Sequence, residues 1–203
     1  MTVAHSGLTG TNLHENKGVA AATDNTVATA VSGATVWAKL TASNLTGTGN
    51  SFGAQLFHAQ DQKASGTSGG TPTTGAWTTH TLNTSVTNEV SGASLSSNQM
   101  ILPAGTYYLE AWAVFNKTGL SRVKIYNITD ASDIFFGASC QYGTTVDQYS
   151  VPTRLEGRFT LSGTKTIALQ YKVAAASGGT DGLGFASSYG TEIYADMKVW
   201  KIS

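Results

Sequence analysis

The chain has 203 residues, of which 40% are apolar and only 12% are charged, about half the usual charged share of a soluble protein. Its 12 Lys and Arg residues balance its 12 Asp and Glu residues, so no net field favours nucleic acid or an anionic membrane as a partner. The single cysteine, Cys140, excludes an intrachain disulfide, and no apolar stretch reaches the roughly 18 residues that span a bilayer.

Aromatic residues divide the chain into two parts. Trp37 is the only aromatic residue among the first 50, and all the others lie at or beyond Phe52. Because aromatic side chains supply much of the burial in a small core, we predict one compact domain over residues 51–203, preceded by an arm, hairpin and linker over residues 1–50. The first residues lack the charged and apolar regions of a secretion signal, which predicts synthesis in a cytoplasm and a soluble product.

Residues 1–25 form the first predicted segment. They combine Gly, Thr, Asn and Ala with only three sizeable apolar side chains, those of Leu8, Leu13 and Val19. Such a segment buries too little apolar surface to offset the entropy that it loses on ordering. We therefore expect an extended arm that becomes ordered against a partner.

A short β-hairpin is predicted next. Residues 27–31 and 35–39 flank a loop that contains Gly33, and a glycine-containing loop of this length is typical of a hairpin. An isolated hairpin is marginal in water. Trp37 is therefore expected to pack on a neighbouring subunit or on a docking surface, and residues 41–50 have the composition of a linker.

From residue 52 onward, apolar and polar residues alternate with the period of two that is typical of β-strands, and no amphipathic helix of ten residues is evident. The clearest alternating sets are Ile167, Leu169, Tyr171, Val173 and Ile193, Ala195, Met197, Val199. The strand candidates are residues 52–60, 76–83, 106–115, 122–128, 134–140, 154–162, 166–173 and 193–200. About eight strands separated by Gly-rich turns predict an all-β fold, an antiparallel sandwich or jelly roll.

Some of these strands carry large apolar residues on both faces, as Tyr107–Leu109 and Trp112 do. One face packs inside the sandwich, and a symmetric partner subunit is the simplest cover for the other. Charged residues interrupt the same apolar patterns and normally need a partner there. An Arg–Glu pair between subunits is one interpretation, and a solvated strand face is the other. These charged residues are Glu110, Arg154, Glu156 and Arg158.

The order of these elements resembles the trimeric C1q/TNF-like jelly roll over residues 51–203. The resemblance rests on an aromatic opening strand at residues 52–57, a region containing Trp77, the apolar–Pro–x–Gly–x–Tyr pattern in residues 101–110, and the closing strand 194–200. It implies a homotrimer. The residues expected at the trimer interface are Tyr108, Trp112, Arg154, Arg158 and Trp200.

Residues 8–20 and 25–29 are similar to the openings of tailed-phage virion proteins of the head-fibre, decoration and fibre-like kinds. This resemblance implies a virion structural protein whose N-terminal segment docks on the particle, on the major capsid protein or another virion protein. It places the protein on the virion surface after synthesis in the host cytoplasm. The docking residues expected in this segment are Leu8, Leu13, His14, Glu15, Val19 and Trp37.

No catalytic, cofactor or metal site is predicted. The arm, with His14 and Glu15, has too few ligands for a metal, and these two residues are expected to make polar contacts with the docking surface. His58, Asp61 and His80 would converge if residues 52–60 paired with residues 76–83, but exposed polar residues at strand ends are the expected outcome. Cys140 is interpreted as a small buried apolar residue.

Tyr142 and Tyr149 flank a polar loop, which is either a recognition patch for carbohydrate or an ordinary surface loop. Three functions follow from these observations. The first is a trimeric head-decoration or head-fibre protein that stabilises or decorates the capsid. The second is a tail fibre or tip that binds a host-surface glycan or protein, although the chain lacks the long shaft of such fibres. The third, a carbohydrate-active enzyme, is disfavoured because no pair of carboxylates stands out.

Overall fold

The computed structural model describes residues 26–31, 34–39, 55–141, 143–144 and 151–202. The chain divides into two units, Met1–Ser51 and Phe52–Ser203, and each is described by itself. In the first unit, β1 (Thr26–Val31) pairs antiparallel with β2 (Ala34–Lys39). The two strands of the expected hairpin are therefore confirmed, and the arm expected over residues 1–25 lies outside the described residues.

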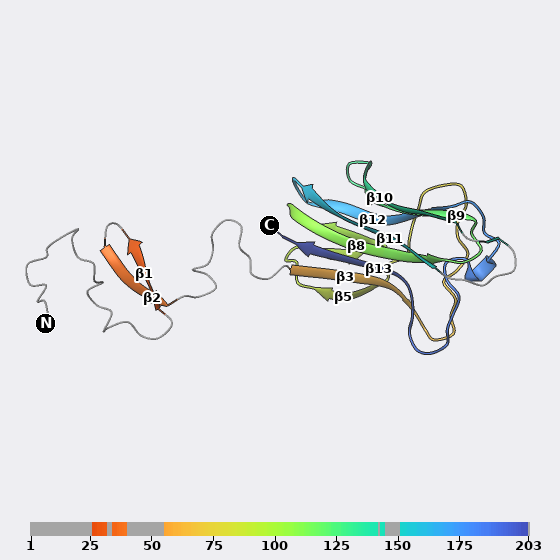
Figure 1. The fold of residues 1–203 in the computed structure, drawn as a ribbon, viewed down its shortest axis with the longest axis horizontal. Helices are drawn as coiled ribbons and strands as arrows, with labels where there is room; N and C mark the ends of the chain where they lie inside the picture. Colours follow the sequence, from red (N-terminus) through yellow and green to blue (C-terminus); the bar gives the residue numbers. More distant parts are fainter. Residues whose placement is uncertain (1–25, 32–33, 40–54, 142, 145–150, 203) are drawn as a thin grey trace, which may run out of the picture. The chain divides into compact units, whose positions relative to one another are not determined.

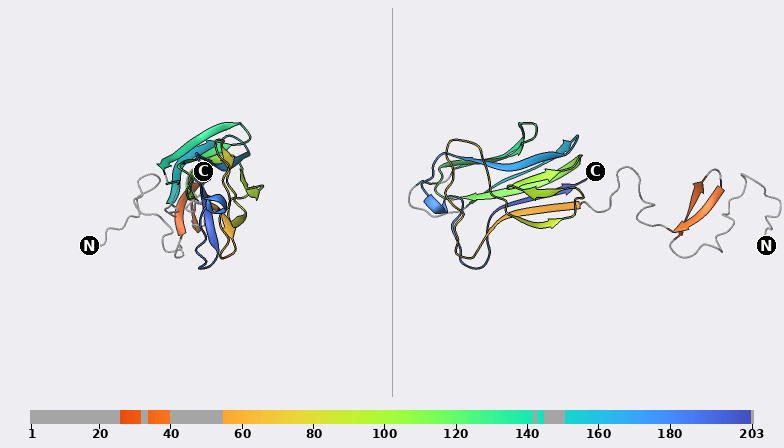
Figure 2. Two further views of the ribbon diagram at one scale, coloured as in Figure 1. Left: turned by 90° about the vertical axis from the view of Figure 1, so that its right-hand side faces the viewer. Right: turned by 180° about the vertical axis from the view of Figure 1, so that it is seen from behind.

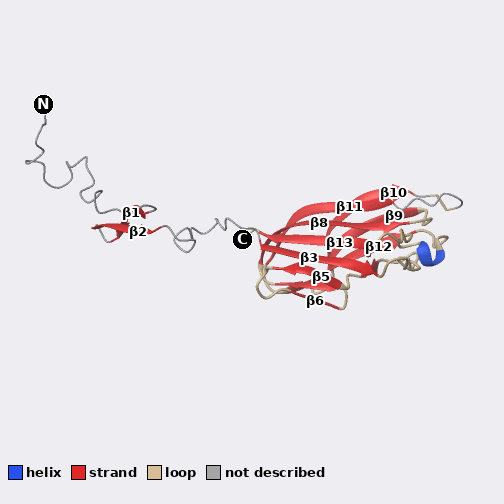
Figure 3. Ribbon diagram, turned by 90° about the horizontal axis from the view of Figure 1, so that it is seen from below, coloured by secondary structure: helices blue, strands red, loops and turns tan. Residues whose placement is uncertain are grey.

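The second unit is a sandwich of two antiparallel sheets (Figures 1 and 2). The five-stranded sheet has the order β11-β8-β13-β3-β5, and these strands lie side by side in Figure 3. Its strands are β11 (Val151–Leu161), β8 (Gly105–Phe115), β13 (Glu192–Lys201), β3 (Gln55–Lys63) and β5 (Thr84–Asn88).

The six-stranded sheet has the order β10-β9-β12-β7-β6, with β4 paired to β12 beside this path. Its strands are β10 (Ser132–Gln141), β9 (Leu120–Asn127), β12 (Lys165–Val173), β7 (Gln99–Leu102), β6 (Ser94–Ser96) and β4 (Thr78–Thr79). The all-β antiparallel sandwich predicted from the sequence is therefore confirmed.

The period-two pattern explains how the two sheets form one core. In β8, Tyr107, Leu109 and Phe115 are buried, while Glu110 between them is exposed. In β12 all four residues of the expected apolar set are buried, because their side chains point into the space between the sheets. Burial of these side chains, at roughly 25 cal/mol for each Å² of apolar surface, is the main force that holds the sheets together.

Three strands were not predicted from the sequence, and one was predicted too long. Residues 76–83 contain only the two-residue β4, and β5, β6 and β7 follow it. Residues Thr84–Asn88 of β5 lie at the edge of their sheet and are largely exposed. Because neither face of this strand is buried in the core, its residues do not alternate between apolar and polar, and the sequence gives no strand signal. The short β6 likewise carries two exposed serines.

The apolar set predicted for the last strand holds at three of its four positions. Ala195, Met197 and Val199 are buried, but Ile193 is 38% exposed and Tyr194 is buried in its place. The pairing of β13 with β3 shifts its register between Ile193 and Ala195. Such an irregularity adds a residue to one strand and reverses the alternation beyond it.

The two ends of the sandwich differ. The start of β3 and the end of β13 are paired and lie at one end, so the last strand is tied into the sheet as expected. The 3-10 turn η4 (Gly179–Asp181) lies at the opposite end, among the longer loops (Figure 1). Among the described residues, no helix is long and apolar enough to cross a membrane.

One carboxylate ties two of these loops together. Glu192, at the start of β13, accepts hydrogen bonds from the backbone N–H groups of Gly66 at 3.1 Å, Ser187 at 3.1 Å and Ser188 at 2.7 Å. The Ser187 hydroxyl donates a fourth at 3.0 Å. These hydrogen bonds favour the ionised form and lower the pKa of Glu192 to about 2.

Replacing Glu192 with Gln is expected to lower the melting temperature of the domain by several degrees at neutral pH, because an amide oxygen is a weaker acceptor for three N–H donors. A lowered pKa contributes stability above the unfolded value of 4.5 and loses it as the pH falls towards about 2. The difference in melting temperature between wild type and Glu192→Gln should therefore shrink over this window. A difference that stays constant from pH 7 to pH 3 would contradict this role.

Candidate functional site

The outer face of the five-stranded sheet gathers all the residues that were expected at a subunit interface. Residues that lie opposite each other in antiparallel strands share one face of the sheet. One row across the sheet contains Arg154, Trp112, Asp196 and Gln60, from β11, β8, β13 and β3 in turn. We call this face the β8 outer face.

Two further rows continue this face. The next row contains Glu156, Glu110, Lys198 and His58, and the one beyond it contains Arg158, Tyr108, Trp200 and Leu56. Tyr108, Trp112 and Trp200 are only half-buried, and the rings of Tyr108 and Trp200 lie 6.1 Å apart. Large aromatic side chains are thus left partly uncovered on a sheet whose other face forms the core.

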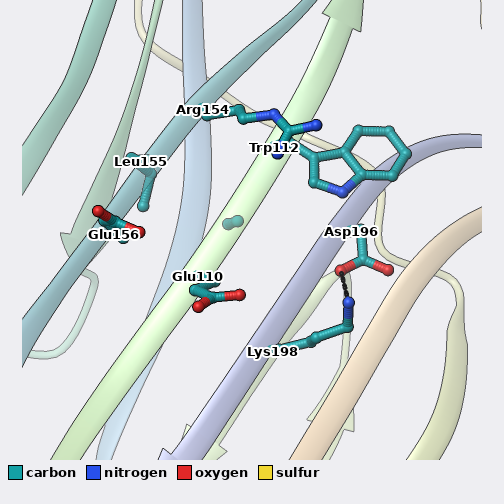
Figure 4. Close-up of a pocket in the computed structure, with 8 residues that line it drawn as sticks. Glu110, Trp112, Arg154, Leu155, Glu156, Asp196 and Lys198 are labelled. Carbon is teal, nitrogen blue, oxygen red and sulfur yellow. Dashed lines mark ion pairs between the residues drawn. The ribbon is translucent and has the colours of Figure 1, made fainter.

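A cavity of about 360 Å³ lies between the first two rows (Figure 4). Its charged lining residues are Glu110, Arg154, Glu156, Asp196 and Lys198, with the Trp112 indole beside them. The cavity is therefore polar and mixed in charge, and it opens on the outside of the sheet rather than in the core.

Asp196 is the best-connected residue of this face and only 4% exposed. Its Oδ2 lies 2.6 Å from His58 Nε2 and accepts a hydrogen bond from Gln60 Nε2 at 2.6 Å. Lys198 Nζ lies 3.5 Å from its Oδ1. Asp196 was not predicted from the sequence as a site residue. An acidic residue in the middle of the apolar strand 193–200 is the signal that would have identified it.

Apart from the network of Asp196, the charged residues near the cavity lack ion-pair partners among the described residues. Glu110 and Glu156 lie directly opposite each other, and like charges in such a pair destabilise a sheet. The Tyr108 hydroxyl donates to Glu156 Oε2 at 3.3 Å. Arg154 and Arg158 are exposed, and neither forms an ion pair with any residue that the structure describes. Each charge therefore remains available to a second molecule.

His58, Asp61 and His80 do not converge. His58 lies on the β8 outer face, whereas Asp61 and His80 are fully buried in the interior, so the expectation of exposed polar residues is wrong for these two. The burial of Asp61 and His80 depends on contacts across the sandwich, which the local sequence does not show. Within the described ranges, no group of three His, Cys, Asp or Glu side chains is placed to hold a metal ion.

Burial changes the acidity of both interior groups. His80 packs against the rings of Phe115 and Tyr171, and desolvation lowers its pKa to about 4. Desolvation also raises the pKa of Asp61 to about 6, against an opposing effect of the Lys63 charge. The Oδ2 atom of Asp61 has no hydrogen-bond partner. Both groups lie in the interior of the sandwich, where they affect its stability.

The remaining predicted residues are placed as follows. Trp37 lies in β2, opposite Ala28. Cys140 is free and half-buried rather than fully buried: it packs against the hydrophobic core and also lines a groove at the six-stranded sheet. Leu8, Leu13, His14, Glu15 and Val19 lie outside the described residues, as do Tyr142 and Tyr149.

The sequence matches no protein-family model and no curated protein. Among solved structures, murine APRIL at pH 8.0 is 13% identical, covers 73% of this chain and 99% of its own, and superposes with a TM-score of 0.50. Murine APRIL at pH 5.0 is 12% identical over 73% of this chain and 99% of its own, with a TM-score of 0.48. The globular domain of zebrafish complement 1qA protein is 10% identical over 73% and 98%, with a TM-score of 0.47. At such identities the likeness shows the fold alone: the second unit is a C1q/TNF-like jelly roll.

Proposed function

We propose that this protein is a non-enzymatic structural protein of a phage virion, a homotrimer that decorates the head surface. The domain over residues 51–203 forms the trimer and the outward knob. Residues 1–50 attach it to the major capsid protein or to another virion protein. The protein stabilises or decorates the particle by spanning neighbouring capsid subunits.

The β8 outer face carries the trimer part of this proposal. It combines half-buried aromatic side chains, two arginines without ion-pair partners in the described residues, and two opposed glutamates. Three copies of this face, arranged around a three-fold axis, supply one another with an apolar cover and with opposite charges. C1q/TNF-like domains typically form homotrimers, which supports self-association of this one.

The proposal that the protein belongs to a virion rests on its N-terminal segment. Its support is the similarity of residues 8–20 and 25–29 to the openings of phage virion proteins. In the second unit, the described residues begin at Gln55, which pairs with Lys201 at the end of β13.

Deleting residues 1–40 is expected to leave a folded, trimeric β protein that no longer binds particles. The deleted segment holds one aromatic residue and none of the core of the second unit. The experiment adds the truncated and the full-length protein to particles that lack the native protein and measures occupancy. Decoration by the truncated protein would place the docking surface on the jelly roll instead.

A point variant, Trp37→Ala, refines the same experiment. Burial of a large apolar side chain contributes roughly 1.5–3 kcal/mol, so loss of three indoles from a trimer weakens attachment by several kcal/mol. The melting temperature of the domain should not change. Unchanged occupancy would show that Trp37 makes no docking contact, and a lowered melting temperature would show that the hairpin packs on the jelly roll.

A further inference from the structure

Exposed apolar side chains gather on the segment between η4 and β13. Tyr189 is 97% exposed, and Phe185 and Ile193 near it in the sequence are exposed as well. We call residues 184–193 the Tyr189 loop; it projects beside the loop that follows β3 (Figures 1 and 2). Single exposed apolar residues are ordinary on a protein surface, whereas a group of them marks a surface for interaction.

The backbone of the Tyr189 loop is fixed. The Glu192 carboxylate accepts hydrogen bonds from the backbone N–H groups of Ser187 and Ser188, and Ser188 has a φ of 62°, in the left-handed region that serine rarely occupies. At the start of the loop, a Cβ on Gly184 would come within 2.1 Å of the Tyr194 ring, so this glycine permits close packing. The exposed tyrosine is therefore presented by a backbone that is ordered before a partner arrives, which lowers the entropy lost on binding.

A groove of about 340 Å³ lies at the six-stranded sheet, where β9 begins and β10 and β12 end. Its exposed surface is almost wholly apolar, and Trp77, Leu120, Val173 and Ala174 are among the residues that line it. Leu120 is 61% exposed. None of the lining residues belongs to the five-stranded sheet, so formation of a trimer through the β8 outer face does not by itself cover the groove.

The Tyr189 loop and the groove are complementary in charge as well as in polarity. Residues 181–192 contain two acidic residues, Asp181 and Glu192, and no Lys or Arg. Around the groove the sign is reversed, because its lining residues include Arg122 and Lys172 and no acidic residue. Since the exposed surface of the groove is apolar, these two charges lie beside it rather than in it. An uncharged aromatic side chain flanked by negative charge thus fits an apolar groove flanked by positive charge.

We propose that the Tyr189 loop of one copy of this chain inserts into the groove of a second copy, with Tyr189 packed against Leu120 and Trp77. The loop and the groove share no residue, so each copy can donate its loop to one neighbour and accept a loop from another. The formal net charge of the chain is zero, so the copies do not repel each other. Such contacts link trimers side by side, which goes beyond the proposed function and depends on neither the trimer nor the N-terminal segment.

The average mass of the full-length protein in sedimentation equilibrium tests the contact. The mass is expected to rise with concentration between about 10 μM and 1 mM, because a contact made by one loop is smaller than the roughly 1,200 Å² of a stable interface and is therefore weak. Tyr189→Ser and Leu120→Asp are each expected to raise the concentration needed for association by about tenfold or more, since each removes a large apolar side chain from the contact.

The matched control is Ile202→Ser, which removes an exposed apolar side chain that belongs neither to the loop nor to the groove. It should associate as the wild type does. All three side chains are exposed, so each variant should keep its fold, and circular dichroism checks this.

A mixture of the two variants tests which surfaces meet. Tyr189→Ser keeps an intact groove and Leu120→Asp keeps an intact loop. An equimolar mixture is therefore expected to associate at concentrations at which neither variant associates alone. A contact between two Tyr189 loops or between two grooves would give no such recovery.

Three results would overturn the proposal. They are a wild-type mass that stays constant up to 1 mM, a folded Tyr189→Ser variant that associates as the wild type does, and a mixture of the two variants that fails to associate where the wild type does. The mass of the starting species is measured separately at micromolar concentration. A monomer there would contradict the proposed function and would leave this test of the loop and the groove unchanged.

Discussion

The Arg154→Glu variant is expected to be a monomer in solution at concentrations at which the wild-type protein is a trimer. Arg154 is exposed on the β8 outer face, beside Trp112 and near the opposed pair of Glu110 and Glu156. A glutamate there places a third carboxylate at the same site in each subunit. Removing one partner of a buried interfacial charge pair costs about 2–5 kcal/mol, which corresponds to a roughly thirtyfold or greater weakening at each interface.

Light scattering coupled to size exclusion measures the molar mass of the variant directly. Lys172→Glu is the matched control, because it reverses an exposed cation on the other sheet and should remain trimeric. Since Arg154 is exposed, the fold of the subunit should be retained, and circular dichroism checks this. A trimeric Arg154→Glu protein would mean that the subunits meet through a different face.

Asp61→Asn is expected to stabilise the domain at neutral pH by about 1–2 kcal/mol. Asp61 is fully buried, one of its oxygens has no partner, and its pKa rises from the ordinary 3.8 to about 6. Ionisation of such a carboxyl costs the folded state up to about 3 kcal/mol above pH 6. Asparagine removes the charge and keeps the shape, but it leaves a polar atom to be buried, which reduces the gain.

The pH dependence of the free energy of unfolding distinguishes the effect of the Asp61 charge from other effects of the substitution. The folded pKa of Asp61 is above the unfolded value, so the penalty is fully present above about pH 6 and disappears as the pH falls towards 3.8. The free energies of unfolding of wild type and Asp61→Asn should therefore converge near pH 4. Taking the difference between the two proteins cancels the opposite effect of His80, whose lowered pKa destabilises the fold over the same range. A gain that is independent of pH would contradict the assignment.

The fold was predictable from the sequence where burial alone decides the side-chain pattern. Residues 106–115 and 166–173 were predicted almost to the residue as β8 and β12, because each strand presents one face to the core. The edge strand β5 was missed because its residues are largely exposed. Ile193 was misplaced because a register shift in β13 cannot be recognised in an uninterrupted apolar alternation.

The β8 outer face could be predicted from the sequence to a larger extent than the groove on the six-stranded sheet could. Tyr108, Trp112, Arg154, Arg158 and Trp200 were singled out because bulky or charged residues on the second face of an apolar strand lack an explanation within one subunit. The structure places them on one face of the sheet, and their place at a trimer interface stays a prediction. The groove lined by Trp77, Arg122 and Cys140 was not predicted. Trp77, Arg122 and Cys140 come from separate segments, and only the pairing of β9 with β10 and β12 brings them together. The opposition of Arg122 and Lys172 likewise depends on strand register, which the sequence does not specify.

The molar mass of the full-length wild-type protein in solution is the most direct test of the account. Trimer formation through the β8 outer face predicts three times the mass of one chain, with no monomer detectable at micromolar concentration. A monodisperse monomer would contradict the account, because the half-buried aromatic side chains of this face, and its two arginines without an ion-pair partner among the described residues, would then face solvent.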